Sequence, residues 1–415
     1  MLEGPDRPAR RADVLIVEGR LQRIEEVGAD VPLGDGIEID AAACWLAPPL
    51  VDPHSVLEEP WEGRAESLES LRAAAAAGGY GTVALLPWAS SWRDRPERLV
   101  LQWPEPMRLL LWGSFSLDGA DRELAPHADQ LAAGALGLAG GDCLPPLDLL
   151  EPGLRLQEMG GRPVLMAPRD ASLASHGFVR ERVEALRAGW PLDPPVSETV
   201  PLQSLLTLAT TTPAVSLRLM NLSTADAIDL LRRGGGNSMA SVGWWHLIAD
   251  SGCLDPSDEG WRVVPPLGGP GDRAALLDGL ASGLISAVAV HHQPLDAEEQ
   301  LLPLDQRRPG LAGHGVALTL LWRELVAGRG WTVERLWQAL CWGPCRFLGL
   351  PPATLALGSR EWILFDPQRN WQWDASSCVS RAANQPCWGR RLEGKVVASG
   401  LVDSAAWSLR DSPSR

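Results

Sequence analysis

The middle of this chain repeats a strand followed by a helix, and this repeat constrains the fold more than any other feature. Residues 67–77 are rich in leucine and alanine and end at a Gly-Gly pair, which is a helix stop signal. A short apolar run, residues 82–87, follows directly, and residues 274–284 and 286–290 read as a further helix and strand. Alternating strands and helices predict a parallel sheet covered by helices. Over roughly 300 residues, the closure that fits best is a (β/α)8 barrel, which typically takes ~250.

A doubly wound open sheet is the alternative architecture. That fold needs a glycine-rich phosphate turn after its first strand, and none is found there. Residues 234–236 are three consecutive glycines, but they follow a helical stretch and lack the G-K-[ST] ending of a phosphate loop. A loop is the simpler interpretation, so the barrel is favoured.

Both ends of the chain are β-rich. Residues 12–21 read as strand, glycine turn and strand, and residues 362–367 read as another strand. The simplest arrangement pairs the two ends. The sequence therefore predicts the α/β class, with a (β/α)8 TIM-type barrel over residues 50–353 and a small β-sandwich domain formed by residues 1–49 and 354–415.

The formal net charge of −15 limits the partners of this chain. An acidic surface repels nucleic acid and anionic membranes, so neither is expected as a partner. No apolar run reaches the roughly 18–20 residues that span a bilayer, and the charged N-terminus lacks the apolar segment of a signal peptide. We therefore expect a cytoplasmic protein, and the sequence leaves a homo-oligomer open.

Cysteine usage argues against a structural zinc site, and lysine is almost absent from this chain. The seven cysteines are scattered, as expected of buried free thiols in an intracellular protein. Cys341 and Cys345 are spaced i, i+4, but Pro344 lies between them and no further ligand pair is near, so we expect no zinc there. Lys395 is the only lysine among 37 basic residues.

Polar residues follow several predicted strands. His54 follows the first barrel strand, Asn221 follows a later one, and His291 and His292 follow the strand that ends at residue 290. In a (β/α)8 barrel, the chemistry lies at the carboxyl ends of the strands. These residues therefore mark the predicted site. For His54 alone, hydrogen bonding within its turn is the simpler interpretation, because Val56 stands where an H-x-H metal turn needs its second histidine.

Residues 51–60, VDPHSVLEEP, resemble the D-x-H-x-H-x-R-x-P turn of dihydroorotase, a family of the amidohydrolase superfamily. Residues 73–88 resemble that family's A-A-A-G-G-x-T-T-V-x-x-M-P-N. The resemblance continues in order along nearly the whole chain. Further matches are residues 221–225 (H-V-S-T-A in the family), 244–247 (P-H-H-L), 264–267 with 272–273 (N-P-P-L-R and D-R), 290–294 (T-D-H-A-P), 309–313 (P-G-I-x-G) and 384–396 (N-T-P-F-x-G to G-K-V).

The resemblance implies a hydrolase that opens or closes cyclic amides with zinc-activated hydroxide. Such a centre needs imidazoles and carboxylates at fixed strand ends. By the resemblance, the family's metal-binding histidines are replaced by Val56, Ala167 and Asn221, and the acid that serves as ligand and general base is replaced by His291. Asp142 remains as one carboxylate. Some relatives bridge two zinc ions with a modified lysine, but the only lysine here lies in the tail.

The substrate side differs from the family as well. By the resemblance, the arginine that pairs with a substrate carboxylate is Glu58, and the asparagine that assists it is Trp88. An arginine–carboxylate pair is charge-assisted and often bidentate, so a glutamate turns attraction into repulsion. The predicted remnants of the substrate pocket are Glu58, Trp88, Asn221 and His292.

These replacements favour a dihydroorotase-like protein linked to pyrimidine biosynthesis that has no catalytic residues and needs no metal. Because some non-catalytic relatives scaffold aspartate carbamoyltransferase, the resemblance implies that enzyme as a partner. The alternative is an active metal-dependent cyclic amide hydrolase of altered substrate, with a rebuilt mononuclear zinc site of His54, Asp142 and His291. A third hypothesis is a small-ligand binding or regulatory protein that keeps the barrel mouth.

Overall fold

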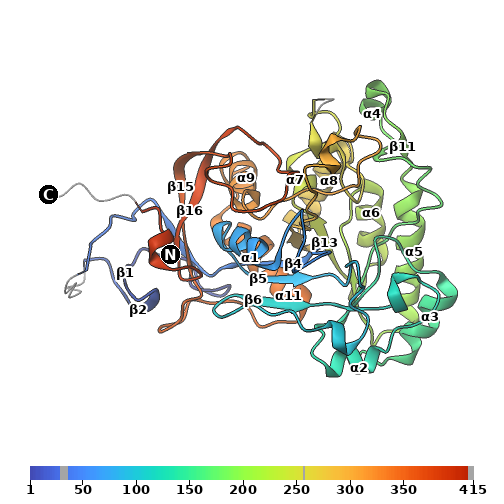
Figure 1. The fold of residues 1–415 in the computed structure, drawn as a ribbon, viewed down its shortest axis with the longest axis horizontal. Helices are drawn as coiled ribbons and strands as arrows, with labels where there is room; N and C mark the ends of the chain where they lie inside the picture. The colour runs from blue at the N-terminus through green and yellow to red at the C-terminus, as the bar shows by residue number, and fades with distance from the viewer. Residues whose placement is uncertain (29–35, 256–257, 410–415) are drawn as a thin grey trace.

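Parallel strands lie in the interior of the barrel part, between helices (Figure 1). Together they form a ring, whose last strand contacts the first. The computed structural model describes residues 1–28, 36–255 and 258–409. Within these residues the ring consists of one sheet of three strands and one of six, and only Trp112 separates the last strand of the first sheet from the first strand of the second. In chain order the strands are β4 (Leu50–Ser55), β5 (Tyr80–Leu85), β6 (Arg108–Leu111), β7 (Gly113–Ser114), β8 (Leu138–Ala139), β9 (Pro163–Met166), β12 (Ser216–Leu219), β13 (Met239–Gly243) and β14 (Ile285–Ala289).

The ring closes where β14 meets β4. The amide of Val56, just after β4, donates to the carbonyl of His292 at 2.8 Å. Within β4, the carboxylate of Asp52 accepts a hydrogen bond from the amide of Val290 at 2.9 Å. Parallel strands inside and helices outside confirm the predicted (β/α)8 class.

Helices follow the strands and cover the outside of the ring (Figure 1). α1 begins after Ser67, whose hydroxyl accepts from the amide of Ser70 at 3.2 Å, where the leucine- and alanine-rich run predicts a helix. α8 begins at Pro270, four residues before the predicted start, because proline suits the first turn of a helix. The helices are α1 (Leu68–Ala77), α2 (His127–Ala132), α3 (Leu147–Leu156), α4 (Val183–Ala188), α5 (Val196–Thr211), α6 (Ala225–Gly234), α7 (Trp245–Ile248), α8 (Pro270–Ala281), α9 (Ala317–Leu321), α10 (Val333–Trp337) and α11 (Gly343–Leu348).

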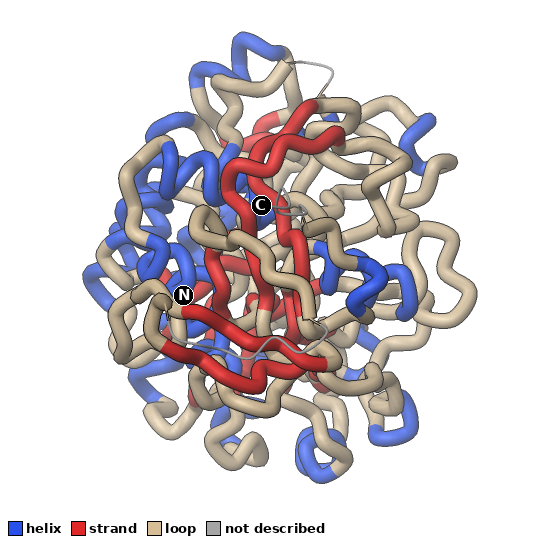
Figure 2. The backbone as a smooth tube through the Cα atoms, turned by 90° about the vertical axis from the view of Figure 1, so that its left-hand side faces the viewer, coloured by secondary structure: helices blue, strands red, loops and turns tan. Residues whose placement is uncertain are grey.

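The two chain ends meet in a small antiparallel sheet (Figure 2). β15 (Ile363–Gln372) pairs with β16 (Arg391–Ser399) on one side and with β3 (Trp45–Ala47) on the other. The hairpin of β1 (Asp13–Val17) and β2 (Arg20–Glu25) packs on this sheet. The buried residues between the hairpin and the sheet are Leu21, Leu46, Trp362 and Ala398.

This sheet is the separate β-domain that the sequence predicts from both ends of the chain. The boundaries of the predicted domain, at residues 49 and 354, stay a prediction. Residues 29–35 and 410–415 of that domain lie outside the described residues. The short pair β10 (Val179–Arg180) and β11 (Leu192–Asp193) is a parallel insertion on the barrel side, between β9 and β12.

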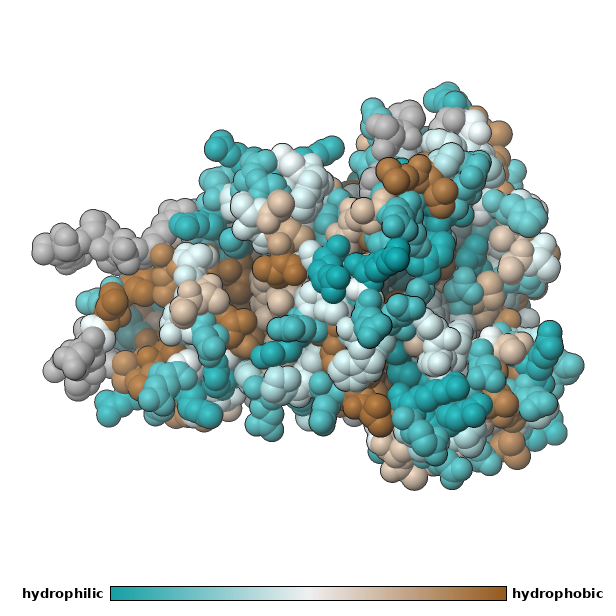
Figure 3. Space-filling model, viewed as in Figure 1, coloured by the Kyte–Doolittle hydropathy of each residue, from teal (hydrophilic) through white to brown (hydrophobic). Residues whose placement is uncertain are grey.

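The surface differs between the two ends of the molecule. Hydrophobic residues gather toward the small-domain end, and hydrophilic residues cover much of the barrel end (Figure 3). None of the described helices combines the length and hydrophobicity needed to cross a bilayer.

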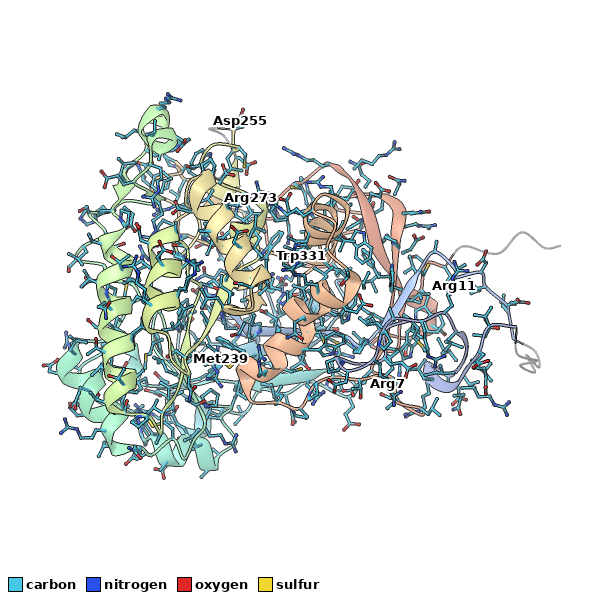
Figure 4. The ribbon with its side chains drawn as sticks, turned by 180° about the vertical axis from the view of Figure 1, so that it is seen from behind. Arg7, Arg11, Met239, Asp255, Arg273 and Trp331 are labelled. Atoms are coloured by element: carbon cyan, nitrogen blue, oxygen red, sulfur yellow. The ribbon has the colours of Figure 1, made fainter. Side chains whose placement is uncertain are left out.

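An arginine ties the outer helices together on the back of the barrel. Arg273 projects from α8 (Figure 4). It lies between two carboxylates, with Nη1 3.4 Å from Asp250 and Nη2 bonded to Glu324. Its Nε donates to the carbonyl of Leu247 at 2.9 Å. Charge-assisted contacts of this kind hold α8 to the segments before and after it.

Asp52→Ala should destabilise the barrel by about 3 kcal/mol or more, because it leaves buried donors without an acceptor. The carboxylate is fully buried and accepts from the amide of Val290, the hydroxyl of Ser55 and Nε2 of His314. Denaturant unfolding measures the effect. Asp229→Ala, which breaks only an exposed pair with Arg232, is the matched control and should stay within about 0.5 kcal/mol. Equal losses in both variants would contradict the role of Asp52.

Candidate functional site

Two histidines lie against each other at the carboxyl ends of β4 and β14. Nδ1 of His54 is 3.0 Å from Nδ1 of His291, and the two rings meet edge to face with their centroids 5.0 Å apart. The two residues, His54 and His291, are 0% and 8% exposed. One nitrogen must donate and the other must accept. The contact therefore requires that at least one of the two rings is neutral.

A serine on β13 completes this pair. Oγ of Ser241 lies 2.9 Å from Nε2 of His54, and it also accepts from the amide of Asn221 at 3.0 Å. Asn221 and His291 have φ angles of 51° and 47°, in the left-handed region. Such backbone costs a non-glycine residue of order 1 kcal/mol and is often found where a chain presents side chains at a functional site.

Burial keeps both rings neutral. It lowers the pKa of His54 to about 4, although the charge of Asp52 opposes this shift. Burial, and then the neighbouring His54, move the pKa of His291 well below its ordinary value. At neutral pH the pair is therefore an uncharged hydrogen-bonding unit, and neither ring is an effective general base.

A pocket opens beside this pair at the mouth of the barrel. It contains about 300 Å³ of space not filled by protein atoms, part of it open to solvent. The structure brings the predicted residues Trp88, Asp142, Asn221 and His291 together here, and His54 contacts the pocket wall through His291. The full lining is Trp88, Asp142, Ala167, Pro168, Arg169, Glu198, Met220, Asn221, Val264, Pro265 and His291.

Two residues predicted as pocket remnants lie elsewhere. Glu58 is on the surface, where its carboxylate pairs with Arg308 at 2.7 Å. His292 lies beneath the surface near the barrel closure, where its Nδ1 accepts from the amide of Gly313 at 3.2 Å. Its Nε2 faces Glu66 at 3.3 Å, close enough for electrostatic attraction but not aligned for a hydrogen bond.

Sequence reasoning missed two buried histidine–carboxylate contacts behind the mouth. Nε2 of His314 lies 2.9 Å from Asp52, and His292 faces Glu66, with the two imidazole centroids 5.0 Å apart. Burial raises the pKa of each carboxyl, but the histidines and nearby hydroxyls outweigh it and lower both pKa values. The sequence positions of His314 and Glu66 could have indicated these contacts. His314 directly follows the P-G-L-A-G match, and Glu66 directly precedes Ser67, the cap of α1.

An ion network along one wall of the pocket was missed as well. Arg180 on β10 is fully buried and donates to Asp193 at 2.9 Å and to Glu198 at 3.0 Å. Glu198 also accepts from the amide and the hydroxyl of Ser223 at 2.7 and 2.8 Å. Burial raises the pKa of Glu198, and Arg180 opposes that shift. No linear motif marks this network, because its members come from the β10–β11 insertion, α5 and the loop before α6.

Comparison with known proteins decides the family. The chain is 33% identical over 424 residues to a dihydroorotase-like protein of Synechocystis sp., covering 92% of this chain and 94% of that relative. This chain belongs to the dihydroorotase-like amidohydrolases. It is also 32% identical over 401 residues to the dihydroorotase of Thermus aquaticus, covering 93% and 92% of the two chains.

Comparison with solved structures supports the barrel fold. The L-hydantoinase of Arthrobacter aurescens superposes with a TM-score of 0.79 at 19% identity, covering 96% of this chain and 92% of that one. No protein-family model matches this dihydroorotase-like chain. The family resemblance predicted from the motifs is confirmed by the relative in Synechocystis sp..

The zinc centre that the dihydroorotase family implies does not fit the donor set of this chain. Both Nδ1 atoms of His54 and His291 face each other, and Nε2 of His54 is occupied by Ser241. Val56 and Ala167 offer no side-chain lone pair. Among residues 1–28, 36–255 and 258–409, no group of three or more His, Cys, Asp or Glu side chains is arranged to hold a metal.

The free energy of unfolding should fall as the pH is lowered from about 7 to about 5. Burial lowers the pKa of His54 and of His246 to about 4, whereas an unfolded histidine has a pKa of about 6.5. The unfolded chain therefore binds protons first, and stability present above about pH 6.5 is lost as the pH falls toward about 4. Each histidine contributes about 2 kcal/mol to the loss by about pH 5. Denaturant unfolding at a series of pH values measures it.

His246→Asn tests the assignment of this pH dependence. Removing one buried histidine should reduce the proton uptake on unfolding in this window by about one. His176→Asn, at an exposed position, is the control and should leave the dependence unchanged. An identical pH profile in wild type and His246→Asn would show that His246 does not contribute to it.

Proposed function

We propose that this chain is a cytoplasmic dihydroorotase-like protein that does not hydrolyse cyclic amides and that scaffolds aspartate carbamoyltransferase. The observation that carries the first part is the 3.0 Å contact between the Nδ1 atoms of His54 and His291. Nitrogens engaged in that hydrogen bond are not offered to a metal. A catalytic zinc needs about three protein ligands and an open position for water, and this mouth does not supply them.

The residue at the family's general-base position also argues against hydrolysis. His291 stands where the resemblance places an acid, and its pKa lies well below the ordinary value because the ring is buried. A general base works best when its pKa is near the working pH. A carboxylate at this position could bind a metal and take up a proton, but this neutral imidazole is held by His54 instead.

The residues at the positions that would hold a substrate carboxylate also argue against hydrolysis. Glu58 carries the wrong charge and is engaged on the surface by Arg308. Nε1 of Trp88 donates to the carbonyl of Gly140 at 2.9 Å, and its ring stands at 89° to that of His291. An indole used in this way forms a wall of the pocket and leaves no donor for a substrate carboxylate.

The scaffold part of the proposal is supported by how much of the family fold is kept. Similarity to the dihydroorotase-like protein of Synechocystis sp. extends over more than nine-tenths of both chains, although most of the family's metal ligands are replaced. A barrel kept without its centre is expected of a protein whose outer surface binds a partner, because function belongs to sites and not to the fold. Dihydroorotase acts next to aspartate carbamoyltransferase in pyrimidine synthesis, which makes that enzyme the candidate partner.

The purified protein should contain no stoichiometric zinc and should not hydrolyse dihydroorotate, even after expression with added zinc. Elemental analysis and a hydrolysis assay check this, with the dihydroorotase of Thermus aquaticus as the active control. Stoichiometric zinc that a chelator removes together with a hydrolase signal would overturn the non-catalytic proposal. It would support the mononuclear site of His54, Asp142 and His291 instead.

Mixing with aspartate carbamoyltransferase from the same organism should give a larger species in size-exclusion chromatography with light scattering, at micromolar concentrations. Repeating the run at raised salt separates a specific complex from weak charge attraction, which salt screens. An unrelated protein of similar size and negative charge is the control. Unchanged elution of both proteins at these concentrations would count against the scaffold role and leave the metal result untouched.

A further inference from the structure

The mouth pocket contains an arginine that no carboxylate holds by a hydrogen bond. Arg169 follows β9 and lines the pocket. Its Nη1 lies 3.8 Å from Asp142 and its Nη2 lies 3.9 Å from Asp193, both beyond hydrogen-bonding distance. Its Nε is buried and has no partner among the described residues. The guanidinium of Arg169 therefore lines the pocket with N–H donors that form no hydrogen bond to a carboxylate.

The neighbouring Arg180 explains why Arg169 is left with free donors. Arg180 takes one oxygen of Asp193 at 2.9 Å, and it donates to Glu198 at 3.0 Å and to Ser197 at 2.7 Å. Its guanidinium is saturated and fully buried, which is typical of a structural arginine. Arg169 shares the same carboxylate only at long range and keeps a side chain that is 16% exposed. The two arginines therefore have different roles.

A second guanidinium, that of Arg262, adds positive charge that acts on Arg169. Burial, and then the charge of Arg169, lower the pKa of Arg262, and the charge of Asp305 opposes this shift. Arg262 lies over the ring of Phe178 at 4.8 Å and donates to a backbone carbonyl, and within the described residues it forms no ion pair with a carboxylate. Neither arginine has a hydrogen-bonded carboxylate partner among the described residues, and their positive charge favours the binding of an anion.

We propose that this pocket binds a small monocarboxylate through Arg169. The planar guanidinium matches a carboxylate in a bidentate contact. The side-chain nitrogen Nδ2 of Asn221, which has no hydrogen-bond partner among the described residues, is a second donor in the lining. Trp88, Met220 and Pro265 offer apolar walls for the body of the ligand.

The lining also sets the charge of the ligand. Asp142 and Glu198 line the same pocket, so a second negative charge, as in phosphate, would be repelled. The anchor differs from the position at which the resemblance places the family's substrate arginine, because that position is Glu58 on the surface. The proposal does not depend on the scaffold role, since it concerns the mouth of the barrel and not its partner surface.

Isothermal titration of the full chain with benzoate and acetate tests this proposal. Benzamide and acetamide, which have nearly the same shapes without the charge, are the controls, and inorganic phosphate tests the limit of one charge. Each acid should bind at least about tenfold more tightly than its amide, because charge-assisted hydrogen bonds are the stronger ones. Equal binding of acid and amide, tighter binding of phosphate, or no binding of either acid at millimolar concentration would overturn the proposal.

Substitutions locate the site. Arg169→Gln should weaken benzoate binding roughly ten- to a hundredfold, and Arg169→Lys should weaken it less, because charge is kept while the planar fork is lost. Arg155→Gln, which breaks only an exposed pair with Glu151 on α3, is the matched control and should bind as wild type does. Circular dichroism confirms folding of each variant. If Arg169→Gln does not fold, the benzoate affinity of Arg169→Lys is the test. Wild-type affinity in Arg169→Lys would then overturn the proposal.

Discussion

The seam between β4 and β14 is the contact on which the rest of the structure depends. Two side chains of β4, Asp52 and His54, make the decisive contacts across it. Asp52 accepts from the amide of Val290 and thereby joins the last strand of the ring to the first. His54, two residues farther along β4, contacts His291 at the mouth of the barrel. A parallel barrel has no free edge only when this seam is closed, so closure of the barrel and the chemistry of the mouth depend on the same few residues.

Closing the seam with neutral imidazoles has a chemical consequence. In a metal centre, the cation would offset the burial of carboxylates and would orient the histidines. Here the histidines orient each other, and Ser241 satisfies the remaining nitrogen of His54. Buried polar groups that are mutually hydrogen-bonded need no metal to be stable. The mouth is thus a hydrogen-bonded cluster of neutral side chains beside a pocket that Arg169, Asp142 and Glu198 line.

The order of elements and the family could be predicted from the sequence. The helix before the Gly-Gly stop and the strand after it correspond to α1 and β5, and the predicted helix and strand near residue 280 correspond to α8 and β14. Asn221 and His291 were placed at the mouth because strand ends converge in a barrel, and Trp88 was placed there by the family resemblance. All three line the pocket. Glu58 was expected near them and instead turns outward to Arg308, because loop side chains are not constrained by strand alternation.

The sequence by itself determined the fold class, the family and the absence of the family's histidines at Val56, Ala167 and Asn221, because these follow from local periodicity and residue identity. Only the tertiary structure decided what the remaining polar groups do. His54 and His291 contact each other although they are 237 positions apart in the sequence. Arg169 keeps free N–H donors because Asp193 is hydrogen-bonded to Arg180. Hydrogen-bond partners and burial are set by which strands become neighbours, and no short stretch of sequence contains that information.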